Sequence, residues 1–79
     1  MNILKVTAKN GVQFNIVQNQ FLGVEIYDAR IDCPRGLGEP LDVISLGMLS
    51  AHEELNFGGD RVLDEDTLDE IALWVEGWM

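Results

Sequence analysis

The dipeptide Asn10-Gly11 places the strongest constraint on the fold of this chain. Two runs of alternating residues, 3–8 and 12–17, flank it on either side. Asn-Gly between such runs is the strongest short-range signal for a β-hairpin, because both residues accept the positive φ of a type I′ turn. An isolated hairpin is barely stable in water, so a further strand or a helix must cover it.

A third strand is expected over residues 21–29, where Leu22, Val24 and Ile26 share one face. Gly23 lies inside this run and is expected to mark a β-bulge. A loop rich in Pro and Gly follows at residues 33–40, with the sequence CPRGLGEP. We therefore expect residues 1–32 to be mainly β and residues 33–40 to separate them from the rest of the chain.

Residues 41–79 are expected to be mainly helical. Apolar residues at helical spacing predict a helix over residues 41–55, with Pro40 at its first position. Gly47 weakens this prediction, and residues 43–46 could form a short strand instead, so both alternatives stay open. The sequence Phe57-Gly58-Gly59 is expected to end the segment.

The last helix carries clearer signals at its start. Asp64 is a good N-cap, and Leu63 can pack on Leu68 as a hydrophobic staple. The expected buried stripe consists of Leu68, Ile71, Ala72, Val75 and Trp78. The predicted class is α+β, an antiparallel sheet made of the hairpin and a third strand, packed against two C-terminal helices. The 79 residues are enough for one domain, 1–79.

Charge is distributed unevenly along the chain. Residues 1–38 have a net charge of +1, whereas residues 39–79 carry 11 Asp and Glu against the single Arg61, a net charge of −10. Direct binding to nucleic acid or to an anionic membrane is not expected, because both need clustered Lys and Arg. A basic protein, or a protein surface that normally binds DNA or RNA, fits this charge.

The acidic residues are densest between positions 60 and 70. Glu65/Asp69 and Asp66/Glu70 are like-charge pairs at i,i+4, each of which costs roughly 0.2–0.5 kcal/mol in a helix. The helix dipole offsets part of that cost for acids in the first turn. A solvated face is one interpretation, and a binding surface for a basic partner is the other. The candidate partner-binding residues are Glu53, Glu54, Asp60, Asp64, Glu65, Asp66, Asp69, Glu70 and Glu76.

Catalytic and metal-binding motifs are incomplete. Residues 52–56, HEELN, begin like the zinc-protease signature HExxH but have Asn56 in place of the second His. An EF-hand loop counted from Asp64 would need Gly at position 69 and Glu at position 75, where the chain has Asp69 and Val75. No arrangement of nucleophile and base is evident in the sequence. We expect a protein without enzymatic activity, metal or cofactor.

The single cysteine, Cys33, cannot form an internal disulfide and favours a reducing compartment. No apolar run approaches the roughly 18–20 residues needed to span a bilayer. The N-terminal residues lack the apolar core of a signal peptide. We expect a soluble, cytoplasmic protein.

In length, acidity and lack of catalytic motifs, the chain resembles the small phage-encoded anti-CRISPR proteins, several of which mimic DNA on type I Cascade complexes. That resemblance implies a non-enzymatic inhibitor that occupies the DNA-binding site of its partner in the host cytoplasm. Two alternatives stay open. One is an immunity protein or antitoxin that neutralises a basic nuclease toxin. The other is a small structural or assembly subunit with an apolar interface at Trp74, Trp78 and Met79, and the chain could be a monomer or a small homo-oligomer.

Overall fold

The computed structural model describes residues 3–19, 23–31, 38–49 and 51–78. Four antiparallel strands form the main sheet in the order β1-β2-β3-β4. Their bounds are β1 (Ile3–Thr7), β2 (Gln13–Asn19), β3 (Gly23–Asp28) and β4 (Asp42–Ser45). A short helix, α1 (Leu46–Leu49), follows β4. Strands β5 (Glu54–Asn56) and β6 (Val62–Asp64) pair as a second antiparallel sheet, and α2 (Glu65–Glu76) follows directly.

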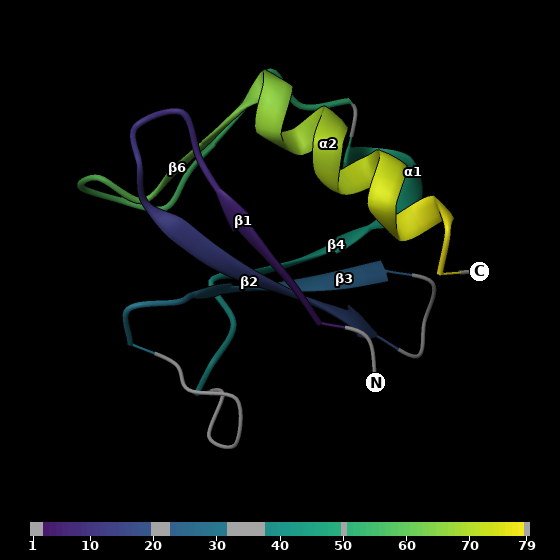
Figure 1. The fold of residues 1–79 in the computed structure, drawn as a ribbon, viewed down its shortest axis with the longest axis horizontal. Helices are drawn as coiled ribbons and strands as arrows, with labels where there is room; N and C mark the ends of the chain where they lie inside the picture. Colours follow the sequence, from purple (N-terminus) through teal and green to yellow (C-terminus); the bar gives the residue numbers. More distant parts are fainter. Residues whose placement is uncertain (1–2, 20–22, 32–37, 50, 79) are drawn as a thin grey trace.

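Helix α2 packs over the main sheet, and the β5–β6 hairpin extends beside the β1–β2 turn (Figure 1). The predicted α+β class, with a hairpin, a third strand and two helices in the second half, is confirmed. The structure adds the fourth strand, which was an open alternative in the sequence, and the second sheet, which the sequence did not predict.

The β1–β2 hairpin is confirmed, but its turn is not the predicted type I′. The Ala8 amide donates to the Val12 carbonyl, and the Gly11 amide donates to the Ala8 carbonyl, both at 2.9 Å. The loop therefore holds three residues, 9–11, and Gly11 has a φ of +92°. This is the usual geometry of a three-residue hairpin loop, in which a turn is followed by a glycine with positive φ. In the predicted turn, Asn10 and Gly11 would be the whole loop. Because Ala8 pairs with Val12, Lys9 joins the loop and Asn10-Gly11 forms its second and third residues.

The core lies between one face of the main sheet and α2. Its fully buried side chains include Phe14 and Ile16 from β2, and Val24 and Ile26 from β3. Helix α2 contributes the predicted stripe, which is confirmed: Leu68, Ile71 and Val75 are buried, while Ala72 and Trp78 are partly buried against the core. Leu22, which the prediction placed on the core face of the third strand, lies outside the described residues.

Gly23 does not form a bulge. It pairs in regular register with Asn19 on β2 and with Ser45 on β4. A Cβ at this position would lie 2.8 Å from the backbone oxygen of Ile44. Glycine is required here because β4 approaches the backbone closely, which is a recognised reason for glycine inside a strand.

The predicted helix over residues 41–55 is wrong, and the strand alternative is the better one. Residues Asp42–Ser45 form β4, which pairs with β3 and buries Ile44 in the core. Two adjacent β-branched residues, Val43 and Ile44, favour this extended conformation. The helix is limited to four residues, and Leu55 lies in β5.

Residues 57–61 connect two strands and do not terminate a helix. Phe57 donates to the Arg61 carbonyl at 2.8 Å, and Arg61 donates to the Gly58 carbonyl at 3.1 Å. Gly58 and Gly59 both have positive φ, at 103° and 59°. The glycines thus form the turn of the β5–β6 hairpin, and the half of the chain predicted to be mainly helical contains three strands.

A search of the described residues finds no helix that is both long enough and apolar enough to cross a membrane.

Candidate functional site

The nine predicted partner-binding acids do not form one uniform surface. Asp64 is the N-cap of α2: its carboxylate accepts hydrogen bonds from the Thr67 amide at 3.1 Å and from the Thr67 hydroxyl at 2.7 Å. It also accepts a hydrogen bond from the main-chain amide of Lys9 at 2.9 Å. Burial disfavours the charged form of Asp64, but these hydrogen bonds outweigh burial and lower its pKa. Asp64 therefore connects α2 to the β1–β2 loop and is engaged within the fold.

Asp60 is also engaged within the fold, by Arg30. The guanidinium of Arg30 contacts both carboxylate oxygens of Asp60, at 2.7 and 3.0 Å. The same group donates to both oxygens of Asp28, at 3.1 and 2.9 Å. Hydrogen bonds from Arg30 lower the pKa of Asp28 and that of Asp60. Because Asp28 is almost fully buried, Arg30 both compensates an interior charge and attaches the β5–β6 loop to the end of β3.

A third link joins the same loops. The side-chain amide of Asn10 donates to the Asp60 carbonyl at 2.8 Å, and its oxygen accepts from the Val12 amide at 3.1 Å. Asn10, Lys9 and Arg30 thus fix the β5–β6 hairpin on the main sheet. These roles are not evident from the sequence, in which Asn10 is a turn signal and Arg30 only a positive charge.

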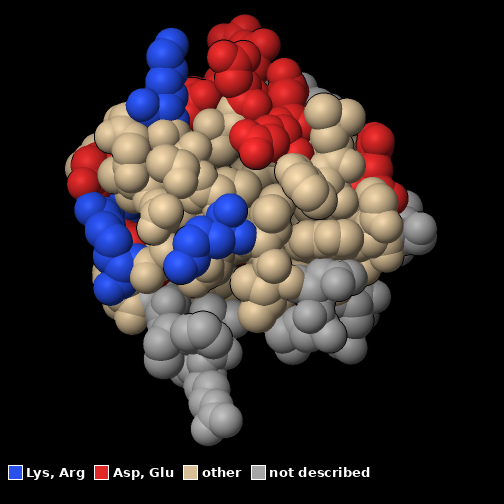
Figure 2. All heavy atoms as spheres, viewed as in Figure 1, with Lys and Arg blue, Asp and Glu red and all other residues tan. Residues whose placement is uncertain are grey.

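The outer face of α2 holds four acids that form no ion pair within the described residues. Glu65 and Asp66 in the first turn, and Asp69 and Glu70 in the second, are all exposed. None of the Lys and Arg side chains in the described part of the chain forms an ion pair with them. Figure 2 shows acidic side chains gathered where Figure 1 places α2, whereas Lys and Arg lie along the left side and centre of this view. The four acids thus lie together on α2, whereas the cations of the described residues lie in β1 (Lys5) and in the loops and turns that hold Lys9, Arg30 and Arg61.

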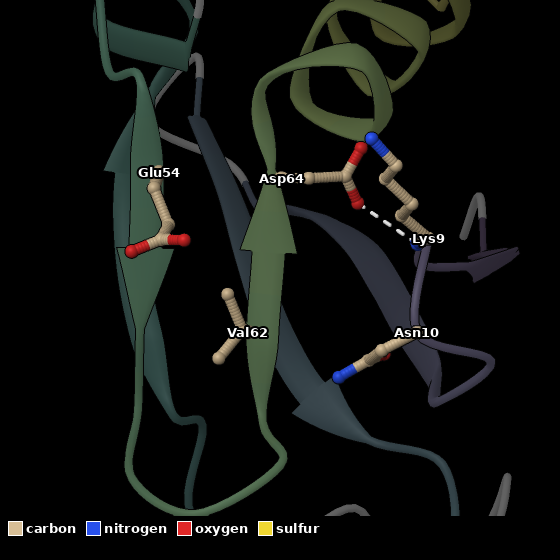
Figure 3. Close-up of a pocket in the computed structure, with 5 residues that line it drawn as sticks. All are labelled: Lys9, Asn10, Glu54, Val62 and Asp64. Carbon is tan, nitrogen blue, oxygen red and sulfur yellow. Dashed lines mark hydrogen bonds between the residues drawn. The ribbon is translucent and has the colours of Figure 1, made fainter.

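Two further acids, Glu53 and Glu54, lie before and within β5. Glu54 pairs in register with Asp64 across the second sheet and is exposed. Glu54 helps to line a pocket of about 250 Å³ together with Lys9, Asn10, Val62 and Asp64 (Figure 3). The residues that line it include no hydroxyl, thiol or imidazole side chain. This pocket marks the junction between the two hairpins.

Glu76, the last predicted residue, lies in the final turn of α2 and is exposed. Between it and the acids of the second turn, the helix presents Leu73 and Trp74, which are 72% and 56% exposed. Leu73 was not among the residues predicted to form the site. Its position, at i+4 from Asp69 and outside the buried stripe, was the available signal for an apolar residue on the acidic face.

His52 is partly buried and shows no convergence with other ligand side chains. Across the described ranges, no group of three or more His, Cys, Asp and Glu side chains is placed to hold a metal ion.

No protein-family model, curated protein or solved structure matches this chain.

Proposed function

We propose that this protein is a non-enzymatic inhibitor that uses the acidic outer face of α2 to occupy a nucleic-acid-binding site on a partner protein. One observation carries the proposal: Glu65, Asp66, Asp69 and Glu70 are exposed on consecutive turns without a compensating cation in the described residues. These acids repel one another at i,i+3 and i,i+4 spacing, which weakens the isolated helix. A cationic partner removes that repulsion when it binds.

The spacing of the carboxylates on α2 suits a partner site whose Lys and Arg side chains normally bind phosphates. Side chains on adjacent helical turns lie about 5–6 Å apart. Duplex DNA carries about one charge per 1.7 Å along its axis, with consecutive phosphates of one strand spread along the helix. A row of carboxylates on a helix therefore offers Lys and Arg side chains a comparable field. Such a field also steers association over a distance of roughly a Debye length, about 8 Å at physiological salt.

The most specific form of the proposal is an anti-CRISPR protein that blocks target-DNA binding by a type I Cascade complex. Its support is the resemblance in size, acidity and absence of a catalytic motif, together with the free acids of α2. Asp60 and Asp64 are engaged within the fold, and Glu53 and Glu54 lie at β5 and not on α2. The proposed contact surface therefore consists of Glu65, Asp66, Asp69 and Glu70, with Glu76 at its end.

A competition assay tests this proposal with a matched pair of variants. Purified type I Cascade is bound to fluorescent target duplex, and the protein is titrated while anisotropy reports displacement of the DNA. The test variant is Asp69→Asn with Glu70→Gln, and the control is Glu39→Gln with Asp42→Asn. Both variants remove one Asp and one Glu. Glu39 precedes β4 and Asp42 is its first residue, so neither control position lies on α2. Circular dichroism checks that both variants fold.

We expect the test variant to inhibit at least about tenfold more weakly, equal to about 1.4 kcal/mol, and the control to act like the wild type. Equal inhibition by all three proteins would contradict a role for the α2 acids. If the wild type leaves Cascade binding to DNA unchanged, the Cascade form of the proposal is wrong. The same variants then test inhibition of a basic nuclease toxin encoded beside this gene, which would support the immunity-protein alternative.

A further inference from the structure

Leu73 is an apolar side chain within the outer, acidic face of α2, and Trp74, the next residue around the helix, lies at the edge of that face beside Glu70. Leu73 and Trp74 are 72% and 56% exposed, although the inner face of the helix buries Leu68, Ile71 and Val75 in the core. The core therefore does not require either side chain at these positions. Of the exposed large hydrophobic side chains among the described residues, these two are the ones on α2, next to its free carboxylates.

Acidic side chains border this apolar pair along the helix. Asp69 and Glu70 lie four residues before Leu73 and Trp74, respectively, and Glu76 lies three residues after Leu73. Residues at these separations are neighbours on a helical surface. The outer face of α2 thus has Leu73 at its centre with charged residues around it, and Trp74 at one edge. Protein interfaces concentrate binding energy in a similar way, in a central Trp or other large side chain surrounded by a polar rim.

The charged border decides which partner fits. In a symmetric dimer through this face, α2 of one copy would meet α2 of the other, and the carboxylates around each apolar pair would face each other. Like charges placed together across an interface oppose association. A cationic surface gives the opposite result, because each carboxylate gains a partner while the apolar pair loses contact with water.

We infer that α2 docks onto a basic protein surface that contains an apolar recess, with Leu73 and Trp74 inserted in the recess and the acids paired with surrounding Lys or Arg. This inference rests on the proposed function and adds to it the chemical character of the partner site. A charged mimic alone would require only cations on the partner, whereas this face requires cations around an apolar centre.

Two synthetic peptides provide a direct test. They have the same length and number of lysines and contain no Trp; one is an amphipathic Lys–Leu helix, and the other has Ser in place of every Leu. The protein carries Trp78→Phe, so that Trp74 is the only fluorescent indole. We expect the Lys–Leu peptide to bind at least about tenfold more tightly than the Lys–Ser peptide and to shift Trp74 emission to shorter wavelength.

Two matched substitutions locate the contact. Leu73→Ala is expected to weaken binding of the Lys–Leu peptide about tenfold and to leave the Lys–Ser peptide unchanged. Ile31→Ala is the control, because Ile31 is 73% exposed but follows β3, outside α2. This control is expected to change neither affinity.

Each remaining outcome separates the inference from the proposed function. Equal affinity for the two peptides, or an unshifted Trp74 emission, would overturn the apolar recess and leave a charge-driven contact standing. A dimer in sedimentation experiments that dissociates in Leu73→Ala would overturn it in favour of a second copy. If neither peptide binds, the basic partner itself is wrong, and the proposed function fails with the inference.

Discussion

Asp64 and Asp66 are separated by one residue, yet the fold uses only the first of them. Asp64 accepts three hydrogen bonds at the start of α2, while Asp66 is exposed in the first turn. We expect Asp64→Ala to lower the free energy of unfolding by about 1–2 kcal/mol, because it removes an N-cap and leaves the Lys9 amide unpaired. Asp66→Ala should have a much smaller effect, since the lost dipole interaction and the relieved repulsion oppose each other. Urea unfolding followed by circular dichroism measures both, and equal losses would contradict the assignment of Asp64.

The Arg30 cluster predicts how stability depends on pH. The pKa values of Asp28 and Asp60 are lowered by hydrogen bonds from Arg30, so the folded state binds protons less readily than the unfolded state. Their stabilising contribution is complete above the ordinary carboxylate pKa of 3.8 and is lost as the pH falls through the lower folded values. We expect the urea midpoint to fall steeply below about pH 4.

The variant Arg30→Gln is expected to be less stable at neutral pH and to show a shallower fall in acid, because both carboxylates then titrate closer to their unfolded values. Lys5→Gln is the control for loss of one positive charge, since the described structure gives Lys5 no ion pair. Parallel acid curves for wild type and Arg30→Gln would show that the cluster does not set the pH dependence.

Strand β4 depends on a close backbone approach at one glycine. Gly23→Ala would place a Cβ 2.8 Å from the Ile44 oxygen, so the β3–β4 pairing must move and stability should fall. Gly47→Ala is the matched control, because a Cβ there meets nothing within 4 Å and the residue lies in α1. Removing glycine from a helix stabilises by about 0.5–1 kcal/mol. Thermal unfolding of the two variants should therefore shift in opposite directions, and a stable Gly23→Ala protein would contradict the close approach.

The elements that sequence predicts well here are those specified by neighbouring residues. The first hairpin follows from alternation around one turn, and α2 follows from a cap and a stripe within 15 residues. Residues 41–55 have apolar spacing compatible with a helix, but β4 forms because β3 offers it partners that lie 16–22 residues earlier in the chain. That pairing depends on tertiary contact, which local periodicity does not encode. The second hairpin was missed because Gly58-Gly59 fits either a helix end or a turn.

Helix α2 presents two leucines in opposite environments. Leu68 is fully buried in the core and Leu73 is 72% exposed. We expect Leu68→Ala to lower the free energy of unfolding by about 2–5 kcal/mol, through lost burial and a cavity, and Leu73→Ala to change it by no more than about 0.5 kcal/mol. Chemical unfolding monitored by circular dichroism tests this. A large loss from Leu73→Ala would mean that Leu73 supports the fold, and its effect on peptide binding would then have a structural cause.

Across the whole molecule, the sequence predicted the sign of the acidic surface but not its extent. Of the nine candidate acids, the fold engages Asp60 and Asp64, because Arg30 and the β1–β2 loop come from the other half of the chain. The net charge of residues 39–79 is thus an overestimate of the charge that a partner meets. The N-cap role of Asp64 is local and follows from the sequence, but its contact with the Lys9 amide and the pairing of Asp60 with Arg30 are long-range contacts that no local pattern encodes.

The combination of charge and apolar surface predicts a distinctive dependence on salt. Affinity for the Lys–Leu peptide should fall as salt rises, because ions screen the exposed carboxylates. Asp69→Asn with Glu70→Gln removes two of those charges and should make the plot of log Kd against log salt less steep. Leu73→Ala should raise Kd by a similar factor at every salt concentration, because burial of an apolar side chain is not screened. A change of slope in Leu73→Ala as large as that in the charge variant would show that the apolar pair acts only by orienting the acids, and would remove the need for a recess on the partner.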